Sequence, residues 1–534
     1  MPNWKDIFTK HGLFPGSDVQ ATQSQTNQSR SESAAGINPV DRSNIIAASK
    51  KFIDPAKYHF TVAAVFSKND GTTWTEATLP QPSNWDGMTD PVLAFSHLGH
   101  AFLVVEPLRF DPDDITVTGI QVFRSTNGGQ TWSQPQSLIA GRPVDGNDDK
   151  SWMACDRSNN PATHGRIYVA WGVSGALRLA RSLDGGQTWH GAGNLPAGAN
   201  VPGTNDAWAP ETTVDYNGIV HVVWHVPGQS TIKYTRSTDG GETFEPQKAI
   251  VTGVTSFTGN LPQTGSFPEF PNAKFRVLTL ATGCALPSGR FLVAWADMRD
   301  GIARLYYRMS DNGGVTWIGP ANGQPLLQWF PANNGLYHFH PQLIATESGV
   351  VGCAFYEFGL KGGGYKVDTR VAGSFSQGDA FDLLTTVTDD PWDPAVNAPL
   401  SHGNPNDTFI GEYFGFDADD ETFAVIWTDT RTGVQELFYD RVGTSKTDIP
   451  EIFKGISAEV FGGVAQDGGG FIIVGGKIIK VPPRGPKWAL LQSMIALDAA
   501  EQIDHSTSTR LVRSIAETIG GISKDIVKQH GKVG

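Results

Sequence analysis

The feature that most constrains the fold of this chain is a short motif that occurs five times at nearly constant spacing. The motif reads Ser-x-Asp/Asn-x-Gly-x-Thr-Trp/Phe, and successive copies start 58, 57, 55 and 73 residues apart. The copies SKNDGTTW, STNGGQTW, SLDGGQTW, STDGGETF and SDNGGVTW begin at Ser67, Ser125, Ser182, Ser237 and Ser310. Self-similarity at a fixed period predicts a fold in which one supersecondary unit recurs along the chain.

Each position of the motif has a structural explanation. The Asp or Asn side chain accepts hydrogen bonds from the backbone of its own turn, and the glycines allow positive φ angles. The Trp or Phe ring packs back onto the unit and buries a large apolar area. We therefore expect the motif to stabilise the fold rather than to form a catalytic site.

The same succession of strands surrounds each copy. An inner strand that begins with Asp-Pro or Pro-Glu is followed by a Gly turn and an apolar strand that ends in Trp or an acid, such as FLVAWAD. A third strand runs into the motif and a fourth follows it, and four strands per repeat predict the blade of an all-β propeller. Two further units, HPQLIATESGVVGCAFYEF and DTFIGEYFGFDADDETFAVIWTDTRTG, keep this order without a good motif. Seven blades are therefore favoured, with six as the alternative.

Composition divides the chain into three parts. Residues 1–23 are expected to form a strap or linker, and residues 24–447 are expected to form the propeller. N-terminal residues would complete the ring of the propeller. Residues 448–534 form a Gly-rich segment followed by two helices, because the apolar residues between 487 and 529 recur at helical spacing. This small α-helical appendage is expected to pack on the propeller. The alternative is a docking or assembly segment for a protein partner.

The net charge of −13 argues against nucleic acid as a partner, because such a chain would not neutralise phosphates. A membrane span is not expected, because no apolar run reaches about 18 residues. The N-terminal sequence lacks an ordinary signal peptide, so we expect a soluble protein that is cytoplasmic or exported by a non-standard route. The three cysteines are far apart and read as buried free thiols. No metal motif is present and no cofactor is expected. Calcium bound by loop carboxylates would be the exception, without support from any motif.

In a propeller, the loops that enter the inner strands and the loops between second and third strands share one end of the axis. The five motifs join third and fourth strands and therefore lie at the other end. The first group of loops contributes Arg30, Glu32, Asp90, Asp149, Lys150, Glu211, His340 and Glu412. The second group contributes Glu106, Arg109, His225, Asp297, Arg299, Tyr356, Glu357, Asp429 and Arg431.

Such a mixture suits a polar ligand, because carboxylates serve acid–base chemistry on a sugar and arginines hold an anion. The pairs Asp297–Arg299 and Asp429–Arg431 recur at the same position of two units, so structural salt bridges are the alternative for them. For Asp90 and Asp149, the alternative is a cap on loop amides.

The repeated motif, an Asp box or BNR repeat, and the strand order resemble the sialidase (neuraminidase) superfamily over residues 24–445. The resemblance implies three arginines that hold a sialic acid carboxylate, a Tyr nucleophile activated by a Glu, and an Asp as acid and base. Glu211 matches the activating Glu, and Arg304 matches the third arginine. Tyr356 and Glu357 match the Tyr-Glu pair of the family.

Other family positions differ. The Arg-Ile-Pro sequence that supplies the first arginine is absent, and Arg30 is a poor replacement for it. Trp224 and His225 stand where the second arginine is expected, and His340 replaces the Tyr nucleophile. These departures point away from sialic acid hydrolysis by the usual route. A neutral His340 imidazole is suited to act as a general base, which suggests a glycan lyase or hydrolase, whereas the alternative is a cap on its strand.

The sequence thus supports more than one function. The favoured one is a carbohydrate-active enzyme, either a sialidase-like glycoside hydrolase or an enzyme that cleaves acidic polysaccharides. Its expected catalytic residues are His340, Glu211, Tyr356, Glu357 and Asp90, and its expected substrate-binding residues are Arg304, Arg299, Arg431, His225, Asp149 and Arg109. The alternatives are a non-catalytic propeller that binds a glycan or a protein, and an assembly protein that docks through its tail.

Overall fold

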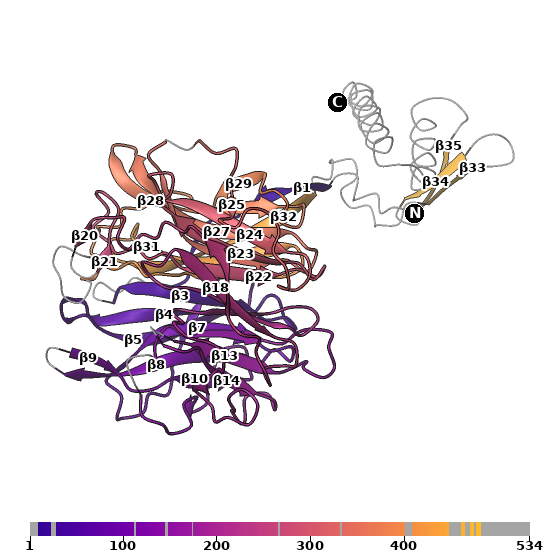
Figure 1. Cartoon of the computed structure of the whole chain (residues 1–534). Helices are drawn as coiled ribbons and strands as arrows, with labels where there is room; N and C mark the ends of the chain where they lie inside the picture. Colours follow the sequence, from indigo (N-terminus) through magenta and orange to yellow (C-terminus); the bar gives the residue numbers. More distant parts are fainter. Residues whose placement is uncertain are drawn as a thin grey trace. The chain divides into compact units, whose positions relative to one another are not determined.

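The computed structural model divides into two units by internal contacts (Figure 1). The larger unit is Leu13–Thr444, and the second combines Met1–Gly12 with Ser445–Gly534. The structure describes residues 9–22, 28–111, 114–144, 148–172, 175–264, 267–331, 334–400, 408–447, 461–464, 470–474 and 477–481. The division into strap, propeller and tail stays a prediction.

Antiparallel sheets follow one another along the larger unit. The first sheet contains β3 (Arg30–Ile37), β4 (Ile45–Asp54), β5 (His59–Ser67) and β6 (Thr75–Ala77), with a short 3-10 helix, η2 (Pro55–Lys57), before β5. The second contains β7 (Gly87–Phe95), β8 (Ala101–Asp111), β10 (Gln121–Ser125) and β11 (Gln136–Ser137), and β9 (Asp114–Val117) pairs with β8. The third contains β12 (Trp152–Cys155), β13 (Ile167–Trp171), β14 (Arg178–Ser182) and β15 (Ala199–Asn200). The fourth contains β16 (Glu211–Val214), β17 (Val220–His225), β18 (Thr231–Ser237) and β19 (Lys248–Thr252).

Three more sheets of this kind complete the larger unit. The fifth contains β22 (Ala281–Ala285), β23 (Phe291–Asp297), β24 (Arg304–Ser310) and β25 (Gln324–Pro325). The sixth contains β26 (Tyr337–Ala345), β27 (Val351–Lys361), β28 (Gly364–Ser374) and β29 (Leu383–Thr386). The seventh contains β30 (Gly415–Ala418), β31 (Thr422–Asp429) and β32 (Glu436–Thr447), and β32 also pairs with β1 (Thr9–Phe14) and β2 (Val19–Gln20). A two-stranded hairpin, β20 (Gln263–Thr264) and β21 (Phe267–Pro268), precedes the fifth sheet.

The first strands of these sheets contact one another in a closed cycle. The cycle runs β3, β7, β12, β16, β22, β26, β30 and back to β3. The second strands β13, β17 and β23 are buried along their whole length. Neighbouring sheets cover both of their faces, which explains why their sequences are continuously apolar rather than alternating. The all-β, propeller-like fold expected from the repeats is therefore present.

The repeated motif forms the same turn in all five copies. The glycine four residues after the serine donates its backbone N–H to the serine Oγ over 2.8–3.0 Å. The threonine two residues later donates its N–H to the Asp or Asn Oδ1 over 2.9–3.0 Å. These bonds confirm the structural role expected for the motif.

The same glycine also packs against the sheet that precedes its own in the cycle. A Cβ atom at Gly314 would lie 1.9 Å from the Tyr234 hydroxyl of the fourth sheet, and one at Gly71 would lie 1.9 Å from the Tyr439 ring of the seventh. The turn after β28 repeats this arrangement without a recognisable motif, because Gly378 bonds to Ser374 over 2.9 Å and abuts Leu292. The motif thus joins neighbouring sheets as well as neighbouring strands.

The N-terminal part of the chain closes the cycle, as the sequence predicted. Val19 pairs with Tyr439 and Gln20 with Phe438, so residues more than 400 positions apart share one sheet. The backbone N–H of Ala21 continues the pairing and donates to Leu437 O over 2.8 Å.

The described segments between residues 461 and 481 form a three-stranded antiparallel sheet of β33 (Phe461–Val464), β34 (Gly470–Val474) and β35 (Lys477–Val481). The helical appendage expected over 487–529 lies outside the described residues. Among the residues that the structure describes, no helix is both long enough and apolar enough to cross a membrane.

Candidate active site

A strained backbone conformation recurs near the start of the first strands. Glu32, Asp90, Lys150, Ala209 and His340 have φ angles between 42° and 56°, in the left-handed region that residues with a side chain rarely adopt. In β3, β7 and β26 the ladder shifts register at this point, as in a β-bulge. Such strain costs about 1–3 kcal/mol per residue and is typical of functional sites.

Three of these side chains meet a fourth, Glu412, which precedes β30. Lys150 Nζ lies 2.6 Å from Glu412 Oε2, 3.1 Å from Asp90 Oδ2 and 3.4 Å from Glu32 Oε1. Lys50 Nζ, from β4, lies 2.6 Å from Glu32 Oε2 and 3.6 Å from Asp90 Oδ1. These contacts bring together the starts of four first strands, as the sequence predicted for one end of the axis.

Two long connections cover this charged cluster. Arg276, from the connection before β22, lies 3.0 Å from Glu412 through its Nε. Its guanidinium carbon is 4.3 Å from the ring centroids of both Phe267 and Phe409. The backbone N–H of Thr408 donates to Lys274 O over 2.6 Å, which joins the two connections. An aromatic clamp on a paired arginine therefore closes this side of the cluster.

Acids outnumber cations in the cluster. The acids are Glu32, Asp90, Glu106, Asp149 and Glu412, and the cations are Lys50, Lys150 and Arg276. Because a buried charge without a partner is costly, the surplus acids must bind protons or a cation.

The surplus lies in a group of three acids. Oxygens of Asp90, Glu106 and Asp149 lie within 4.8 Å of one another. Asp90 and Glu106 are buried, whereas Asp149 is half-buried. Neither Glu106 oxygen accepts a hydrogen bond from a described donor, although Glu106 and Asp149 share a bond when one of them is protonated.

The three acids differ in protonation. Burial, together with the charges of Asp149 and Asp90, raises the pKa of Glu106 well above its usual value. Burial and the Asp90 charge raise the pKa of Asp149 to about 6. Burial opposes the ionisation of Asp90 as well, but Lys150 and Lys50 outweigh it and hold the pKa of Asp90 below its usual value. An ionised and a protonated carboxyl group thus stand side by side at mildly acidic pH.

Carboxylates in this arrangement are also ligands that Ca²⁺ prefers. The ammonium group of Lys150, however, already lies 3.1 Å from Asp90 and repels a second positive charge. Protonation therefore accounts better than a metal ion for the surplus acids.

His340 occupies the same left-handed position in the sixth sheet. It is 1% exposed, and neither ring nitrogen has a hydrogen-bond partner among the described residues. Burial lowers the pKa of His340 to about 3, against the opposing charge of Glu412. The imidazole is therefore neutral at physiological pH, but such a low pKa makes it a weak base, which does not favour the general-base role.

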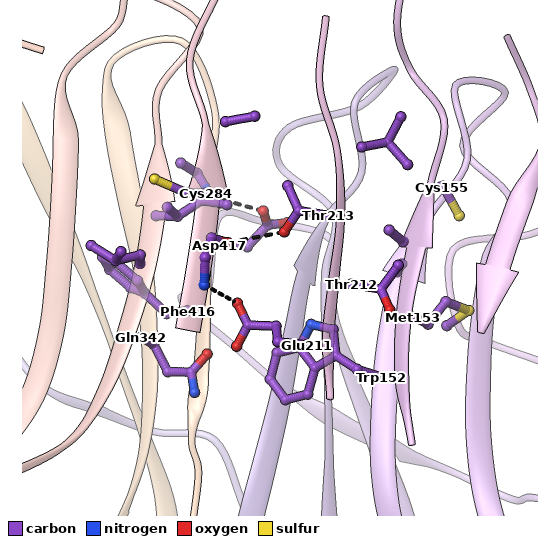
Figure 2. Close-up of a pocket in the computed structure, with 18 of the residues that line it drawn as sticks. Trp152, Met153, Cys155, Glu211, Thr212, Thr213, Cys284, Gln342, Phe416 and Asp417 are labelled. Atoms are coloured by element: carbon purple, nitrogen blue, oxygen red, sulfur yellow. Dashed lines mark hydrogen bonds between the residues drawn. The ribbon is translucent and has the colours of Figure 1, made fainter. Parts of the chain in front are cut away.

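Glu211 lies in a different environment, at an axial cavity of about 260 Å³ lined by the first strands of all seven sheets in the described part of the chain (Figure 2). Its Oε1 accepts hydrogen bonds from Gly283 N–H over 2.8 Å and from Thr282 Oγ1 over 2.9 Å. Burial raises the pKa of Glu211 to about 8, and these two bonds only partly oppose it. Glu211 is therefore protonated at neutral pH.

Tyr356 and Glu357, which the resemblance pairs, point in opposite directions because adjacent residues of a strand face opposite sides. The Tyr356 hydroxyl accepts a bond from Thr428 N–H over 3.2 Å and packs between sheets. Glu357 bonds to His338 over 3.0 Å and to Arg370 over 2.8 Å, and these charges hold the pKa of Glu357 at about 2 despite burial. Neither side chain contacts the charged cluster.

The arginines expected to bind substrate bond within the protein. Arg299 pairs with Asp297, which also accepts from Trp295, and Arg431 repeats this contact with Asp429. Arg304 donates to Leu336 O, Pro331 O and Asn334 Oδ1 over 2.7–2.9 Å. These contacts favour the structural alternative stated for the recurring Asp–Arg pairs.

Two other predicted residues also lie apart from the cluster. Both nitrogens of His225 lie within 3.1 Å of backbone carbonyls, and His225 is buried. Arg109 is exposed and donates to Asn84 O over 2.9 Å. Arg30, the poor replacement for the first family arginine, pairs with Glu76 over 2.8 Å.

Lys50 and Arg276 were missed by the sequence reasoning. Lys50 stands in the apolar strand sequence IIAASKKFID, where a buried lysine requires an acidic partner. Arg276 lies in the one long interval between motifs, 73 residues against 55–58, which marks an insertion. That length difference was the available signal for a connection that covers the axis.

Comparison with known proteins gives distant structural similarities. No protein-family model and no curated protein matches the chain. A protein of unknown function from Dyadobacter fermentans is similar at 17% identity and a TM-score of 0.41, over 67% of this chain and 98% of that one. The NanB sialidase from Streptococcus pneumoniae is similar at 13% identity and a TM-score of 0.39, over 64% and 67%. An α-L-arabinofuranosidase from Fusarium graminearum is similar at 12% identity and a TM-score of 0.38, over 69% and 96%.

Proposed function

We propose that this protein is a glycoside hydrolase built on a seven-bladed β-propeller, with its reaction centre at Asp90 and Asp149. The observation that carries the proposal is that an ionised and a protonated carboxyl group have oxygens within 4.8 Å of each other at one end of the axis. Seven sheets whose first strands form a closed cycle support the blade number over the described residues.

The spacing of the carboxyl groups favours one type of reaction. Retaining glycosidases place two carboxyl groups about 5–5.5 Å apart, whereas inverting enzymes need about 6.5–9.5 Å for an intervening water. Oxygens of Asp90 and Asp149 lie within 4.8 Å of each other, which is shorter than the inverting separation and closer to the retaining one.

In the proposed first step, Asp149 donates its proton to the glycosidic oxygen while an Asp90 oxygen bonds to the anomeric carbon. The bond between that carbon and the leaving oxygen breaks, and the leaving group departs as an alcohol. In the second step, water attacks the anomeric carbon, its proton goes to Asp149, and the Asp90 carboxylate is released. Asp149 suits the acid role because it keeps a proton at mildly acidic pH beside the ionised Asp90.

The charge of the cluster favours neutral glycans over the acidic ones suggested by the resemblance. Five acids face three cations, and each cation is already paired with an acid of the cluster. With the surplus acids protonated, the remaining acids balance the cations, so the carboxylate of a sialic or uronic acid would find no unpaired cation in the cluster, which disfavours its binding.

A turnover screen tests the proposal. Purified protein is assayed against aryl glycosides of neutral sugars, neutral polysaccharides, sialosides and uronic-acid polysaccharides, together with Asp149→Asn and the motif variant Asp184→Asn. We expect release of neutral sugar that Asp149→Asn lowers by about 10²–10⁴-fold and Asp184→Asn leaves unchanged. Turnover should also fall as pH rises above about 6, because Asp149 loses its proton there.

Turnover that survives Asp149→Asn would overturn the assignment of the acid. New ultraviolet absorbance from unsaturated uronate, lost in His340→Ala, would instead support the lyase suggested by the neutral imidazole of His340.

A non-catalytic glycan-binding propeller is the second candidate. The clamp of Phe267 and Phe409 on Arg276 supports it, because this clamp covers the cluster. Binding on a glycan array, unchanged by Asp149→Asn and without turnover on any substrate, would favour this candidate.

A further inference from the structure

The axial cavity opens at the end of the axis that carries the motifs. Its lining includes the exposed residues Arg157 and Glu347, which lie in the turns from β12 to β13 and from β26 to β27. Because successive strands of each sheet are antiparallel, turns from first to second strands share this end with the motif turns. The charged cluster lies at the opposite end. A dissolved molecule therefore reaches the axial cavity without passing the proposed reaction centre.

Three side chains line the inner end of this cavity. Trp152, Glu211 and Gln342 come from three different first strands, β12, β16 and β26. Figure 2 shows the Glu211 carboxyl group between Gln342 and Trp152. The same three side chains also border a smaller cavity whose wall includes Asp90 and Lys150. We call Trp152, Glu211 and Gln342 the inner group.

Polar atoms of the inner group lack protein partners. Both hydrogen bonds of Glu211 use Oε1, so Oε2 has no partner among the described residues. The Gln342 side chain, 8% exposed, makes no hydrogen bond with those residues, and neither does the indole N–H of Trp152. Buried polar groups are otherwise almost always bonded to protein or to another molecule. Three unbonded groups from separate strands therefore face one space.

The chemistry of these groups matches a hydroxylated ligand. Protonated Glu211 and the indole N–H of Trp152 donate hydrogen bonds, and the Gln342 amide both donates and accepts. A hydroxyl group likewise donates one bond and accepts others, so it can satisfy any member of the inner group. The half-buried Trp152 ring adds an apolar surface for the C–H groups of such a ligand. Aromatic walls with a few convergent polar groups are typical of small-molecule sites.

Charge and volume restrict the ligand further. Among the described lining residues of the axial cavity, Arg157 is the one cation, and it lies at the exposed opening. A charged ligand at the inner end would lose water without gaining an opposite charge, because Glu211 is protonated at neutral pH. At about 30 Å³ per water molecule, a cavity of about 260 Å³ has the volume of roughly nine waters. That space suits one sugar ring and excludes an oligosaccharide.

We propose that the axial cavity is a second ligand site, which binds one neutral monosaccharide through hydrogen bonds from its hydroxyl groups to Glu211, Gln342 and Trp152. This site is separate from the reaction centre at Asp90 and Asp149. The inference goes beyond the proposed glycoside hydrolase and does not depend on it.

Ligand-detected NMR on the full chain tests the site. The probes are D-glucose, D-galactose, D-mannose, D-xylose and L-arabinose, each titrated into the wild-type protein and four variants. We expect at least one probe to bind with a Kd of about 1 mM, a usual affinity for a ligand of this size. Maltotriose should not displace it, because a trisaccharide exceeds the cavity volume.

Glu211→Met and Gln342→Met replace polar groups by apolar ones of similar length. Each should weaken binding about tenfold, as expected for one lost hydrogen bond to a buried group. Glu211→Gln keeps an acceptor for Thr282 and Gly283 and a donor toward the cavity, so its Kd should stay near the wild-type value. Glu245→Met is the matched control, because Glu245 pairs with Arg236 and lines neither cavity.

Three results would overturn the inference. The first is that none of the probes binds at concentrations up to about 100 mM, which would mean that the cavity holds water only. The second is binding that both methionine variants retain, and the third is displacement by maltotriose, since either would place the sugar elsewhere. If one methionine variant fails to fold, the Kd of the other decides. Absence of turnover on every substrate would remove the proposed hydrolase and leave this inference intact.

Discussion

The two ends of the axis differ in what is repeated. At the end that carries the motifs, the same side chains recur and make the same bonds, as Ser237 and Asp239 do with Gly241 and Thr243. At the other end, the left-handed backbone recurs while its side chains differ, from Glu32 and Asp90 to Lys150 and His340. Repeated side chains identify architecture, whereas a repeated backbone that presents different side chains identifies a site.

The ends also differ in how their polar atoms are satisfied. Burial opposes the ionisation of Asp184 and Asp239, but the hydrogen bonds that their oxygens accept within their own turns together outweigh it and lower the pKa of both side chains. Burial raises the pKa of Glu106, Asp149 and Glu211 at the other end and along the axis. The hydrogen bonds of the motif end stabilise the fold. The raised pKa values of the other carboxyl groups are typical of residues that transfer protons in catalysis.

The largest predicted difference concerns turnover. Asp90→Asn removes the charge on which both proposed steps depend, and we expect kcat/KM to fall by about 10³-fold, or about 4 kcal/mol. Asp239→Asn, the equivalent change at the motif end, should alter kcat/KM less than twofold. Steady-state kinetics on the best neutral substrate measures both. Equal losses in the two variants would erase the proposed distinction between the ends.

The next largest difference concerns stability. Gly314→Ala places a Cβ 1.9 Å from the Tyr234 hydroxyl at a φ of +81°, so we expect a loss of about 3 kcal/mol or more in the free energy of unfolding. Gly301→Ala is the matched control, because its φ is +76° and a Cβ there meets nothing within 4 Å. It should cost only about 1 kcal/mol for the backbone conformation. Urea denaturation gives both values, and similar losses would show that contact between sheets contributes little.

The third prediction is an opposite response to pH. The folded state binds the Glu211 proton more tightly than the unfolded state does, so wild-type stability should fall as pH rises from about 5 to 8. The slope from this group is at most about 1.4 kcal/mol per pH unit. Glu211→Gln keeps an acceptor for both hydrogen bonds but has no proton to lose. The free energy of unfolding of this variant, relative to that of the wild-type protein, should therefore rise across this range and level off above pH 8.

An aspartate of the repeated motif should respond to pH in the opposite direction. Because the pKa of Asp239 is lowered in the folded state, ionised Asp239 should stabilise the folded protein above pH 4, and this stabilisation should be lost at lower pH. Denaturation at several pH values compares Glu211→Gln and Asp239→Asn with the wild-type protein. A Glu211→Gln advantage that is constant with pH would contradict the raised pKa of Glu211.

The smallest predicted effect comes from the motif hydroxyl. Ser237→Ala leaves the buried N–H of Gly241 without its 2.8 Å bond and should cost about 1–2 kcal/mol. Ser376→Ala lies in the turn after β28, which lacks a recognisable motif. This change removes an exposed hydrogen bond of 3.1 Å from Ala380 N–H and should cost less. Thermal denaturation detects both changes, and the reverse order would mean that the imperfect turn carries more of the stability than the motif does.

Much of the fold was predictable because it depends on local rules. The motif spacing and the apolar second strands predicted sheets such as β22 to β25 with their turns. The meeting of Asp90, Asp149, Lys150 and Glu412 followed from placing the starts of first strands at one end of the axis. The pairing of residues near 20 with β32 followed from the need to close a ring.

The rest of the site was not predictable, because it depends on contacts that carry no periodic signal. Arg276 reaches Glu412 from an insertion whose path no pattern specifies. The resemblance paired Tyr356 with Glu357, but strand alternation separates their side chains. Lys50 changes the protonation of Glu32 and Asp90 from a neighbouring strand, an effect that only the folded contacts reveal.

The pairing of β2 with β32 also determines when the fold can be completed during synthesis. The partner of Gln20 is Phe438, so the seventh sheet stays incomplete until the ribosome has added more than 400 residues. At about 5–20 residues per second, the newborn N-terminal strand waits for roughly 20–80 s. Throughout that time the ring is open, with an edge strand available to any other extended chain. The edge strand is therefore exposed to aggregation until β32 has been synthesised and has paired with β2.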